Sequence, residues 1–265
     1  MPELPEVETA RRAVVKAARG RVIRKVLTVD DSIVYDGVTP AQVAKALARR
    51  TFADMHRHGK QLWVELDRGP ALLVHFGMTG WLHVYKTEAE RPRFWKLELL
   101  LDNGTRVAYR DPRRFGRIRL RDDPRTEPPV SELGFDPLHH LPAPSVFRTE
   151  MLRRKAPVKA VLLDQSFSAG VGNWIADEVL YQSGIDPRRR AHELSAPEVD
   201  RLRLKLRDII RHAVKVGADD SKFPATWLFH YRWGKTRNAV DGHGHPITFG
   251  TVGGRTTAWV AKRQR

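Results

Sequence analysis

The sequence opens with PELPEVETARR over residues 2–12, and this stretch predicts the first element of the fold. Pro5 suits the first turn of a helix, where its missing N–H costs nothing. The apolar residues that follow it share a helical spacing: Val7, Ala10, Val14 and Ala17. We therefore expect the chain to begin with an amphipathic helix that stops at Gly20.

Short apolar runs separated by Gly, Pro, Asp and Asn come next, with a clear turn at Asp102-Asn103-Gly104. One predicted helix, Pro40–Arg49, interrupts them. The expected strands are Val22–Val29, Gln61–Leu66, Ala71–His75, Trp81–Tyr85, Lys96–Leu101 and Thr105–Tyr109. Many short strands at this spacing indicate a β-sandwich or barrel that carries a few helices.

The composition then changes, because Asp122–Pro144 is rich in Pro, Asp and Glu and is typical of a linker, with room for a short helix. The spans predicted to be helical after it are Val146–Arg154, Val158–Asp164, Val171–Ser183 and Pro197–Val216. Thr226–Val260 carries Gly turns and β-branched residues, which favour a closing hairpin. We predict an α+β chain divided into an N-terminal domain (1–122), a linker (123–144), a helical domain (145–225) and a hairpin (226–265).

Charge and composition narrow the class of partner. The 265 residues include 47 Lys and Arg against 31 Asp and Glu, a formal charge of +16, which favours a polyanion and most simply nucleic acid. A basic protein that is merely soluble is the alternative, and a membrane surface fits less well, because no long basic amphipathic helix stands out. No cysteine is present, which excludes disulfides and cysteine-bound metal. Without a signal peptide or an apolar run near 20 residues, we expect an intracellular monomer, in the cytoplasm and nucleoid or in a nucleus.

Pro2 and Glu3 suggest covalent chemistry at the chain end. Removal of Met1, usual before a small residue, would leave a secondary amine, and an α-amine with a pKa of about 7.7–8 is partly neutral near physiological pH. Such an amine can attack a sugar C1′ and form an iminium. Glu3 and Glu6 are close enough in sequence to donate or accept a proton. A Pro-Glu pair alone favours the alternative, in which the two residues only begin a helix.

Further motifs follow in order along the chain, and together with PELPEVETARR they resemble the formamidopyrimidine-DNA glycosylase and endonuclease VIII family. The lysine turn of that family resembles His58-Gly59-Lys60. Its HLGMSG and DPRRFG segments resemble residues 75–80 (HFGMTG) and 111–116 (DPRRFG). Its helix–two-turn–helix module resembles residues 164–178. The matches span nearly the whole chain.

The resemblance implies a role for each matched residue. Lys60 would contact a phosphate beside the lesion and assist catalysis. Met78, Arg113 and Phe115 would fill the space left by a flipped base, which offsets the cost of flipping; core packing is the alternative for Met78 and Phe115. Asn173 follows a Gly-x-Gly turn that opens a helix, a place that favours an anion.

Glu178 is a charge within an apolar helix, and the resemblance places it near the catalytic proline as a supporting residue. The alternative is a solvated helix face.

The tail departs from the commonest family pattern, in which a finger carries four cysteine ligands. His243 and His245 alone do not make a structural zinc site, so we expect no metal and no cofactor. The tail resembles the zincless-finger branch of plant and fungal members, with Arg255 as the finger arginine that grips phosphate. Without ligands, we expect packing alone to hold the finger.

The resemblance implies a bifunctional DNA glycosylase and abasic-site lyase of base excision repair that acts on damaged double-stranded DNA lying between the two main domains. It would use a Pro2 Schiff base and β,δ-elimination. The alternatives are a catalytically silent DNA-binding protein on the same scaffold and an RNA-binding protein of the ribosomal type. Residues 217–230 contain little glycine and include Pro224, unlike the flexible loop that covers 8-oxoguanine in zinc-bearing bacterial members, which predicts a preference for other oxidised lesions.

Overall fold

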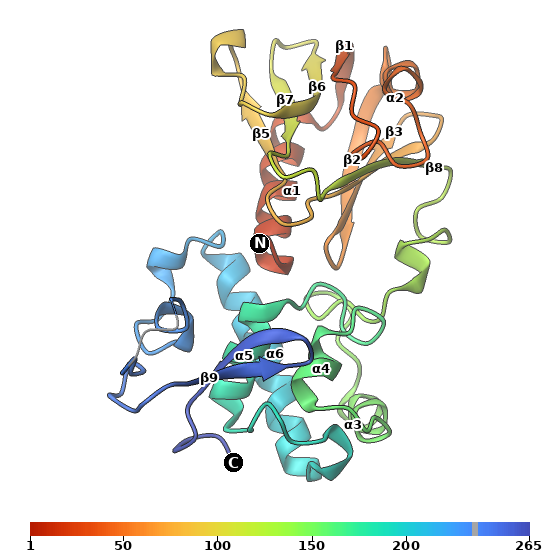
Figure 1. Ribbon diagram of the computed structural model, residues 1–265. Helices are drawn as coiled ribbons and strands as arrows, with labels where there is room; N and C mark the ends of the chain where they lie inside the picture. The colour runs from red at the N-terminus through yellow and green to blue at the C-terminus, as the bar shows by residue number, and fades with distance from the viewer. Residues whose placement is uncertain (235–237) are drawn as a thin grey trace. The chain divides into compact units, whose positions relative to one another are not determined.

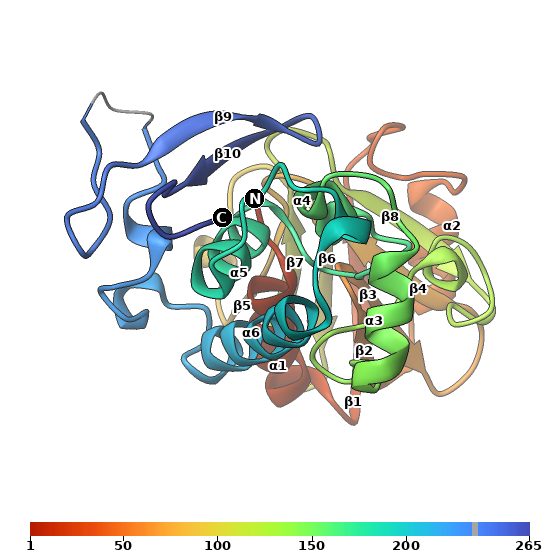
Figure 2. The ribbon, with the colours of Figure 1, turned by 90° about the horizontal axis from the view of Figure 1, so that it is seen from below.

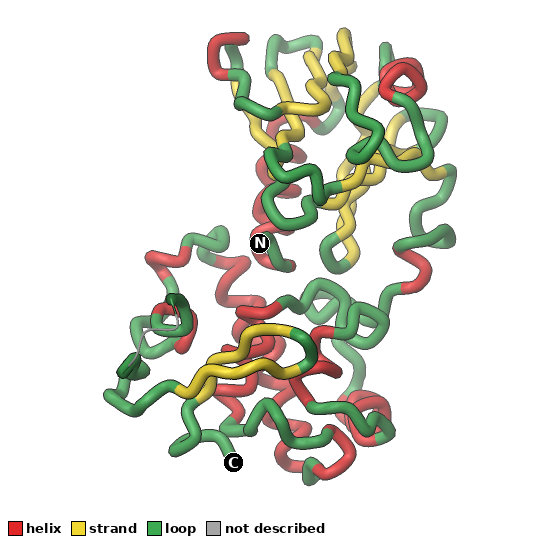
Figure 3. The backbone as a smooth tube through the Cα atoms, in the orientation of Figure 1, coloured by secondary structure: helices red, strands yellow, loops and turns green. Residues whose placement is uncertain are grey.

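The computed structural model describes residues 1–234 and 238–265, which form two compact units (Figure 1). The first comprises Met1–Pro2 and Glu6–Glu132, and the second comprises Glu3–Pro5 and Leu133–Arg265. Strands dominate the first unit, whereas the second is helical apart from one hairpin (Figure 3). The predicted α+β class is therefore confirmed. The span predicted for the finger includes residues 235–237, which lie outside the described residues.

The first unit is built on one antiparallel sheet with the strand order β5-β7-β6-β1-β2-β3-β4-β8. Strand β1 pairs with β2 only at its first two residues and with β6 along the rest, so the sheet bends around β1 into two layers (Figure 1). Its elements are α1 (Leu4–Ala18), β1 (Arg21–Thr28), α2 (Pro40–Leu47), β2 (Thr51–His58), β3 (Gln61–Leu66), β4 (Ala71–His75), β5 (Trp81–Tyr85), η1 (Glu88–Glu90), β6 (Trp95–Leu101), β7 (Arg106–Arg110), β8 (Arg117–Arg121) and η2 (Val130–Glu132).

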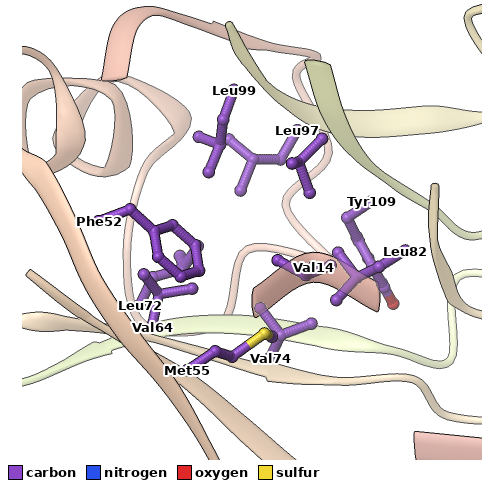
Figure 4. Close-up of a pocket in the computed structure, with 11 residues that line it drawn as sticks. Val14, Phe52, Met55, Val64, Leu72, Val74, Leu82, Leu97, Leu99 and Tyr109 are labelled. Atoms are coloured by element: carbon purple, nitrogen blue, oxygen red, sulfur yellow. The ribbon is translucent and has the colours of Figure 1, made fainter. Parts of the chain in front are cut away.

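An apolar core fills the space between the layers and α1. Val14 of α1 meets Phe52, Leu99 and other apolar side chains from both layers around a cavity of about 20 Å³ (Figure 4). That volume is close to the volume of one water molecule. The lining residues are apolar apart from Tyr109, so a water molecule there would find almost no hydrogen-bond partner. The interior of the sandwich is therefore a packed core, and functional residues must be sought at the ends of its strands.

The second unit packs its helices around one apolar core, in which α5 is buried along most of its length. Its elements are α3 (Pro144–Leu152), α4 (Val158–Leu163), α5 (Asn173–Ser183), η3 (Ala191–Glu193), α6 (Ala196–Lys215), η4 (Asp220–Lys222), η5 (Leu228–His230), β9 (Thr248–Val252) and β10 (Arg255–Trp259). A capping box at Ser195 and Glu198 begins α6, and Gly184 in the left-handed region ends α5. The β9–β10 hairpin lies beside α5 and α4 (Figure 2).

Three expectations from the sequence need correction. Strands β2 and β8 are missing from the predicted set, because their residues are mostly charged or polar; in β8 only Ile118 is buried. The closing hairpin is confined to residues 248–259, whereas most of the described part of the predicted span before it forms turns and one short 3₁₀ helix, η5. The helix expected over Val146–Arg154 begins earlier, at Pro144, because proline suits a first turn. No helix in the described part of the chain is long and apolar enough to cross a membrane.

Candidate active site

Glu3 lies at the start of helix α5 in the second unit. Its carboxylate accepts hydrogen bonds from the backbone N–H groups of Gly172 (2.9 Å), Trp174 (2.9 Å) and Ile175 (3.2 Å). The first N–H groups of a helix have no partner within it, and the helix dipole favours a negative charge there. Glu3 is 2% exposed, so this contact fixes the carboxylate in one orientation.

Gly172 is required at this position by close approach. A Cβ atom there would lie 2.3 Å from the carboxyl carbon of Glu3. The Gly-x-Gly turn therefore makes room for a carboxylate of the same chain, an anion that the sequence pattern did not identify. Leu4 adds a second link, because its N–H donates to the Gly170 carbonyl at 3.1 Å.

Pro2 directly precedes Glu3 and is half-buried, and Glu6 is half-buried on the first turn of α1. The chain therefore places an N-terminal residue next to a carboxylate held by three hydrogen bonds. The Glu3 carboxylate, which can carry a proton, belongs to the residue that directly follows Pro2. The catalytic roles of Pro2, Glu3 and Glu6 stay predictions.

In the first unit, a buried ion pair joins α1 to the turn that carries Lys60. The carboxylate of Glu8 accepts from Arg57 Nε at 3.0 Å, and both side chains are 1% exposed. Arg57 also donates to the Gly59 carbonyl at 2.9 Å, and Arg11 donates to Glu8 as well. Burial raises the pKa of Glu8, but hydrogen bonds from Arg11 and Arg12 outweigh it and lower the pKa to about 2. Half-buried Lys60 is therefore anchored through its neighbour Gly59.

Strand register brings three predicted segments to one end of the sheet. Gln61 pairs with His75, and His75 pairs with Arg117. Lys60 therefore lies at the same end of β3, β4 and β8 as residues 76–80 and residues 111–116. Sequence reasoning had matched these segments separately.

Asp111, which is fully buried, ties two of these segments together. One of its oxygens accepts from the Thr79 hydroxyl (3.0 Å) and the other from the Gly116 N–H (2.7 Å). Gly77 allows the segments to touch, because a Cβ atom there would lie 2.4 Å from the Phe115 carbonyl carbon. In the sequence, Asp111 was matched only as part of the DPRRFG motif, and its role in joining the two segments was not predicted.

The side chains on these joined turns are exposed, unlike their anchors. Met78 is 37% and Phe115 is 48% exposed, and the Arg113 guanidinium lies 4.9 Å from the centre of the Phe115 ring. The core-packing alternative for Met78 and Phe115 is therefore wrong. Apolar side chains held on rigid turns are suited to insertion between bases.

His75 lies at the centre of this end of the sheet. Its Nδ1 accepts from the Gly77 N–H at 3.2 Å. Burial, followed by the charges of Lys60 and Arg119, lowers the pKa of His75 to about 4. The imidazole is therefore neutral at physiological pH, which preserves the lone pair that holds the turn.

The finger hairpin carries Arg255, which is exposed, and it is not held by packing alone as the sequence suggested. Asn173 donates from its side chain to the Thr256 carbonyl at 2.9 Å. Lys159, which is fully buried, donates to the same carbonyl at 3.0 Å, and its ammonium group lies 2.7 Å from the Asp177 carboxylate. Ionic and polar contacts therefore hold the finger. Within residues 1–234 and 238–265, no group of three or more His, Asp or Glu side chains is arranged to bind a metal ion.

Glu178 is fully buried in α5, so the alternative of a solvated helix face is wrong. Its carboxyl accepts from the Gln182 side chain and from the Phe229 N–H, both at 2.8 Å. Burial raises the pKa of Glu178 to about 7, more than these hydrogen bonds lower it. Glu178 therefore titrates near neutral pH.

Glu178→Gln is expected to gain stability relative to the wild type as pH rises. Between pH 4.5 and about 7 the folded protein keeps a proton on Glu178 that the unfolded chain releases, so the wild-type free energy of unfolding falls. The neutral amide removes this loss, a relative gain of up to about 3 kcal/mol at pH 8 compared with pH 4. Urea unfolding of both proteins at the two pH values measures it. A difference that stays constant across this range would show that Glu178 does not titrate there.

Comparison with known proteins covers most of the chain. The family models described as "Formamidopyrimidine-DNA glycosylase N-terminal domain" and "Formamidopyrimidine-DNA glycosylase H2TH domain" match residues 1–118 and 133–225. The formamidopyrimidine-DNA glycosylase of Arabidopsis thaliana is 39% identical, with 100% of this chain and 71% of the relative covered. That of an Exiguobacterium species is 32% identical, with 100% of both chains covered.

Solved structures agree with this result. A crystal structure of the complex between Lactococcus lactis Fpg and a FAPY-dG-containing DNA has a TM-score of 0.86 and 25% identity, covering 99% of this chain and 100% of that one. A complex of the LlFpg protein with a THF-DNA and an inhibitor has a TM-score of 0.86 and 27% identity, with both chains fully covered. The family models alone match more than half of the residues. The chain therefore belongs to the formamidopyrimidine-DNA glycosylase family of DNA-repair glycosylases.

Proposed function

We propose that this protein is a bifunctional glycosylase and abasic-site lyase that acts on oxidised bases in double-stranded DNA. The observation that carries the proposal is the Glu3 carboxylate, which follows Pro2 and is held by three backbone N–H groups. The similar Lactococcus lactis complexes hold DNA with an abasic site, THF or Fapy-dG, which supports damaged DNA as the substrate class. The direct test is borohydride trapping of the protein on a lesion-containing duplex.

The reaction begins once removal of Met1 frees the Pro2 nitrogen. Its lone pair attacks the sugar C1′, and the base leaves with the electrons of the glycosidic bond and takes up a proton. Glu3 is the proposed carrier of protons at the sugar, with Glu6 as a second carboxylate. Opening of the sugar ring gives an iminium between Pro2 and C1′. Loss of a proton from C2′ then expels the 3′ phosphate, a second elimination expels the 5′ phosphate, and water releases the sugar fragment from Pro2.

The remaining predicted residues bind DNA in this proposal. Lys60, Asn173 and Arg255 contact phosphates, whereas Met78, Arg113 and Phe115 occupy the space of the flipped base. We retain the functional division into a catalytic domain (1–122), a linker (123–144), a helix–two-turn–helix domain (145–225) and a zincless finger (226–265). Glu178 supports the site from within α5.

Arg255→Ala is expected to weaken binding to a lesion duplex about tenfold at 0.1 M salt, because a charged hydrogen bond contributes about 1.5–3 kcal/mol. The slope of log K against log salt should become shallower by about 0.9, the contribution of one neutralised phosphate. Fluorescence anisotropy across a salt series measures both. Arg211→Ala, which removes an exposed arginine on α6, is the matched control. Equal behaviour of the two variants would remove Arg255 from the DNA contact.

The segment 217–230 argues against 8-oxoguanine as the preferred lesion. Several of its N–H groups are already engaged: those of Phe223 and Trp227 donate to nearby carbonyls, and that of Phe229 donates to Glu178. Aromatic rings fix the segment as well, since Phe223 lies 5.0 Å from Trp227 and 5.0 Å from Phe229 between ring centres. Amides that are occupied within the protein cannot also bind the edge of a base, and a site without the matching donors loses affinity for that base.

We therefore expect faster single-turnover excision of formamidopyrimidine and hydantoin lesions than of 8-oxoguanine opposite cytosine. A difference of about 10²-fold or more corresponds to roughly 3 kcal/mol of transition-state binding. Matched duplexes that differ only in the lesion provide the measurement. Faster removal of 8-oxoguanine would show that another segment supplies the donors.

A further inference from the structure

We propose that Lys159, Asp177 and Arg232 form an ionic latch that positions the finger arginine, Arg255, for its phosphate. The inference rests on the proposed function, because it assigns Lys159 to the placement of a DNA contact. Lys159 does not itself touch DNA in this proposal. It is a positioning residue that acts through the backbone of β10.

Three oxygen atoms surround the ammonium group of Lys159. It donates to the Thr256 carbonyl (3.0 Å) and the Thr257 hydroxyl (2.7 Å), and it lies 2.7 Å from the Asp177 carboxylate. The Thr257 hydroxyl in turn donates to the carbonyl of Arg255 at 3.0 Å. Lys159 therefore fixes the carbonyls of Arg255 and Thr256, one through a hydroxyl and one directly. The ammonium group therefore makes two hydrogen bonds and one close ion pair.

Asp177 holds β10 from a second point. Its other carboxylate oxygen accepts from Arg232 at 2.7 Å and from the Ala258 N–H at 3.2 Å. Arg232 is 6% exposed, and Asp177 is 1% exposed. The latch thus engages residues on both sides of Thr257, with its side chains contributed by α4, α5 and the segment that follows η5.

The turn of the hairpin rests on the same helix as Lys159. A Cβ atom on Gly253 would lie 3.0 Å from the Ala160 side chain, so α4 and the turn are in direct contact. Asn173, at the start of α5, donates to the same Thr256 carbonyl as Lys159. Asn173 and Lys159 therefore share one acceptor, the carbonyl of Thr256, the residue that directly follows Arg255.

The charges in the latch argue for a role beyond stability. Two cations and one anion are buried together, and burial lowers the pKa of Lys159 more than Asp177 raises it. Apolar residues of similar volume often stabilise a core as well as a buried ion pair does, whereas ionic contacts demand one geometry. A finger without cysteine lacks the four thiolate ligands that could set the direction of its strands. The latch supplies that direction through fixed hydrogen bonds.

The test compares Lys159→Met and Thr257→Val, alone and combined with Arg255→Ala. Thr257→Val removes only the hydroxyl between Lys159 and the Arg255 carbonyl. Each protein is assayed well below its melting temperature for binding to a duplex with a tetrahydrofuran abasic analogue over a salt series. Lys215→Met, which replaces an exposed lysine on α6, is the control.

We expect Lys159→Met to lose about tenfold in affinity, comparable to loss of one charged hydrogen bond, and to flatten the salt slope by about 0.9. In the Arg255→Ala background, either latch variant should cost little more, because the contact it positions is already gone. Thr257→Val should show a smaller loss of the same kind. Because Thr257→Val keeps the buried charges, its affinity and salt slope still test the latch if Lys159→Met does not fold.

The latch proposal would be overturned if Thr257→Val kept the affinity and the salt slope of the wild type. It would also be overturned if the loss of affinity in a latch variant simply multiplied with the loss caused by Arg255→Ala. A purely structural role would lower the melting temperature and leave the salt slope of the folded protein unchanged. If the wild type itself does not bind the duplex in preference to an undamaged one, the proposed function fails instead. The two failures are therefore distinguishable.

Discussion

Glu3→Gln is expected to lower the rate of base excision by about 10²–10⁴-fold, the usual contribution of a positioned proton carrier. The amide keeps the size of the side chain but cannot hold or transfer the proton. Cleavage of a preformed abasic site should fall much less, because no base has to leave. Single-turnover rates on lesion and abasic duplexes, with borohydride trapping of each, measure the two steps separately.

Two controls separate chemistry from folding. The side-chain amide introduced by Glu3→Gln would face backbone donors with an N–H₂ group, and an unsatisfied buried donor costs about 1–3 kcal/mol, so the melting temperature of this variant must be recorded. Glu193→Gln changes an exposed carboxylate on η3 of the same unit and should keep wild-type rates.

Pro2→Gly retains a primary amine and should keep part of the lyase activity with a weaker adduct. If the wild type forms no adduct after intact mass shows that Met1 is removed, the chain is a silent DNA-binding protein. Wild-type excision by Glu3→Gln would assign the proton to another group.

Glu8→Gln is expected to lower the free energy of unfolding by about 3 kcal/mol at pH 7, in line with breaking a buried ion pair. The Arg57 side chain, 1% exposed, would lose its anionic partner. A carboxyl whose pKa falls from 4.5 to about 2 on folding contributes a similar amount at neutral pH. Urea unfolding measures the loss.

The pH dependence gives this prediction a distinct signature. Because folding lowers the pKa of Glu8, its contribution is complete above pH 4.5 and disappears as pH falls toward 2. The difference between wild type and Glu8→Gln should therefore shrink between pH 5 and pH 3. Glu88→Gln is the control, since the Glu88 side chain is 65% exposed in its pair with Arg91 and should cost at most about 1 kcal/mol. A constant difference across this range would mean that the destabilisation comes from packing.

Much of the fold could be predicted because the signals are local. Pro5 and the apolar spacing after it predict α1, and the Asp102-Asn103-Gly104 turn predicts the connection between β6 and β7. Strand β8 could not be found in this way. Its sequence, RIRLR, is mostly charged, and its pairing with β4 and the single buried Ile118 establish it as a strand.

The candidate site was found from motifs, but its contacts join residues far apart in sequence. Glu3 and Gly172 are separated by 169 positions, and no spacing rule connects them. Glu178 was ambiguous for a similar reason, because one charge in an apolar helix fits a solvated face or a buried site. In the structure Glu178 is buried, and it accepts a hydrogen bond from the N–H of Phe229, 51 positions further along the chain.

The sequence by itself determined the class of fold, the basic charge, the absence of cysteine and the identity of the residues at the chain end. These depend on composition, periodicity and short motifs, which act over a few residues. Only the tertiary structure decided that Glu3 is held by the N–H groups of α5 and that Lys159 and Asp177 hold the finger. Buried charges require partners, and which partners they find depends on how distant segments pack rather than on their neighbours in the chain.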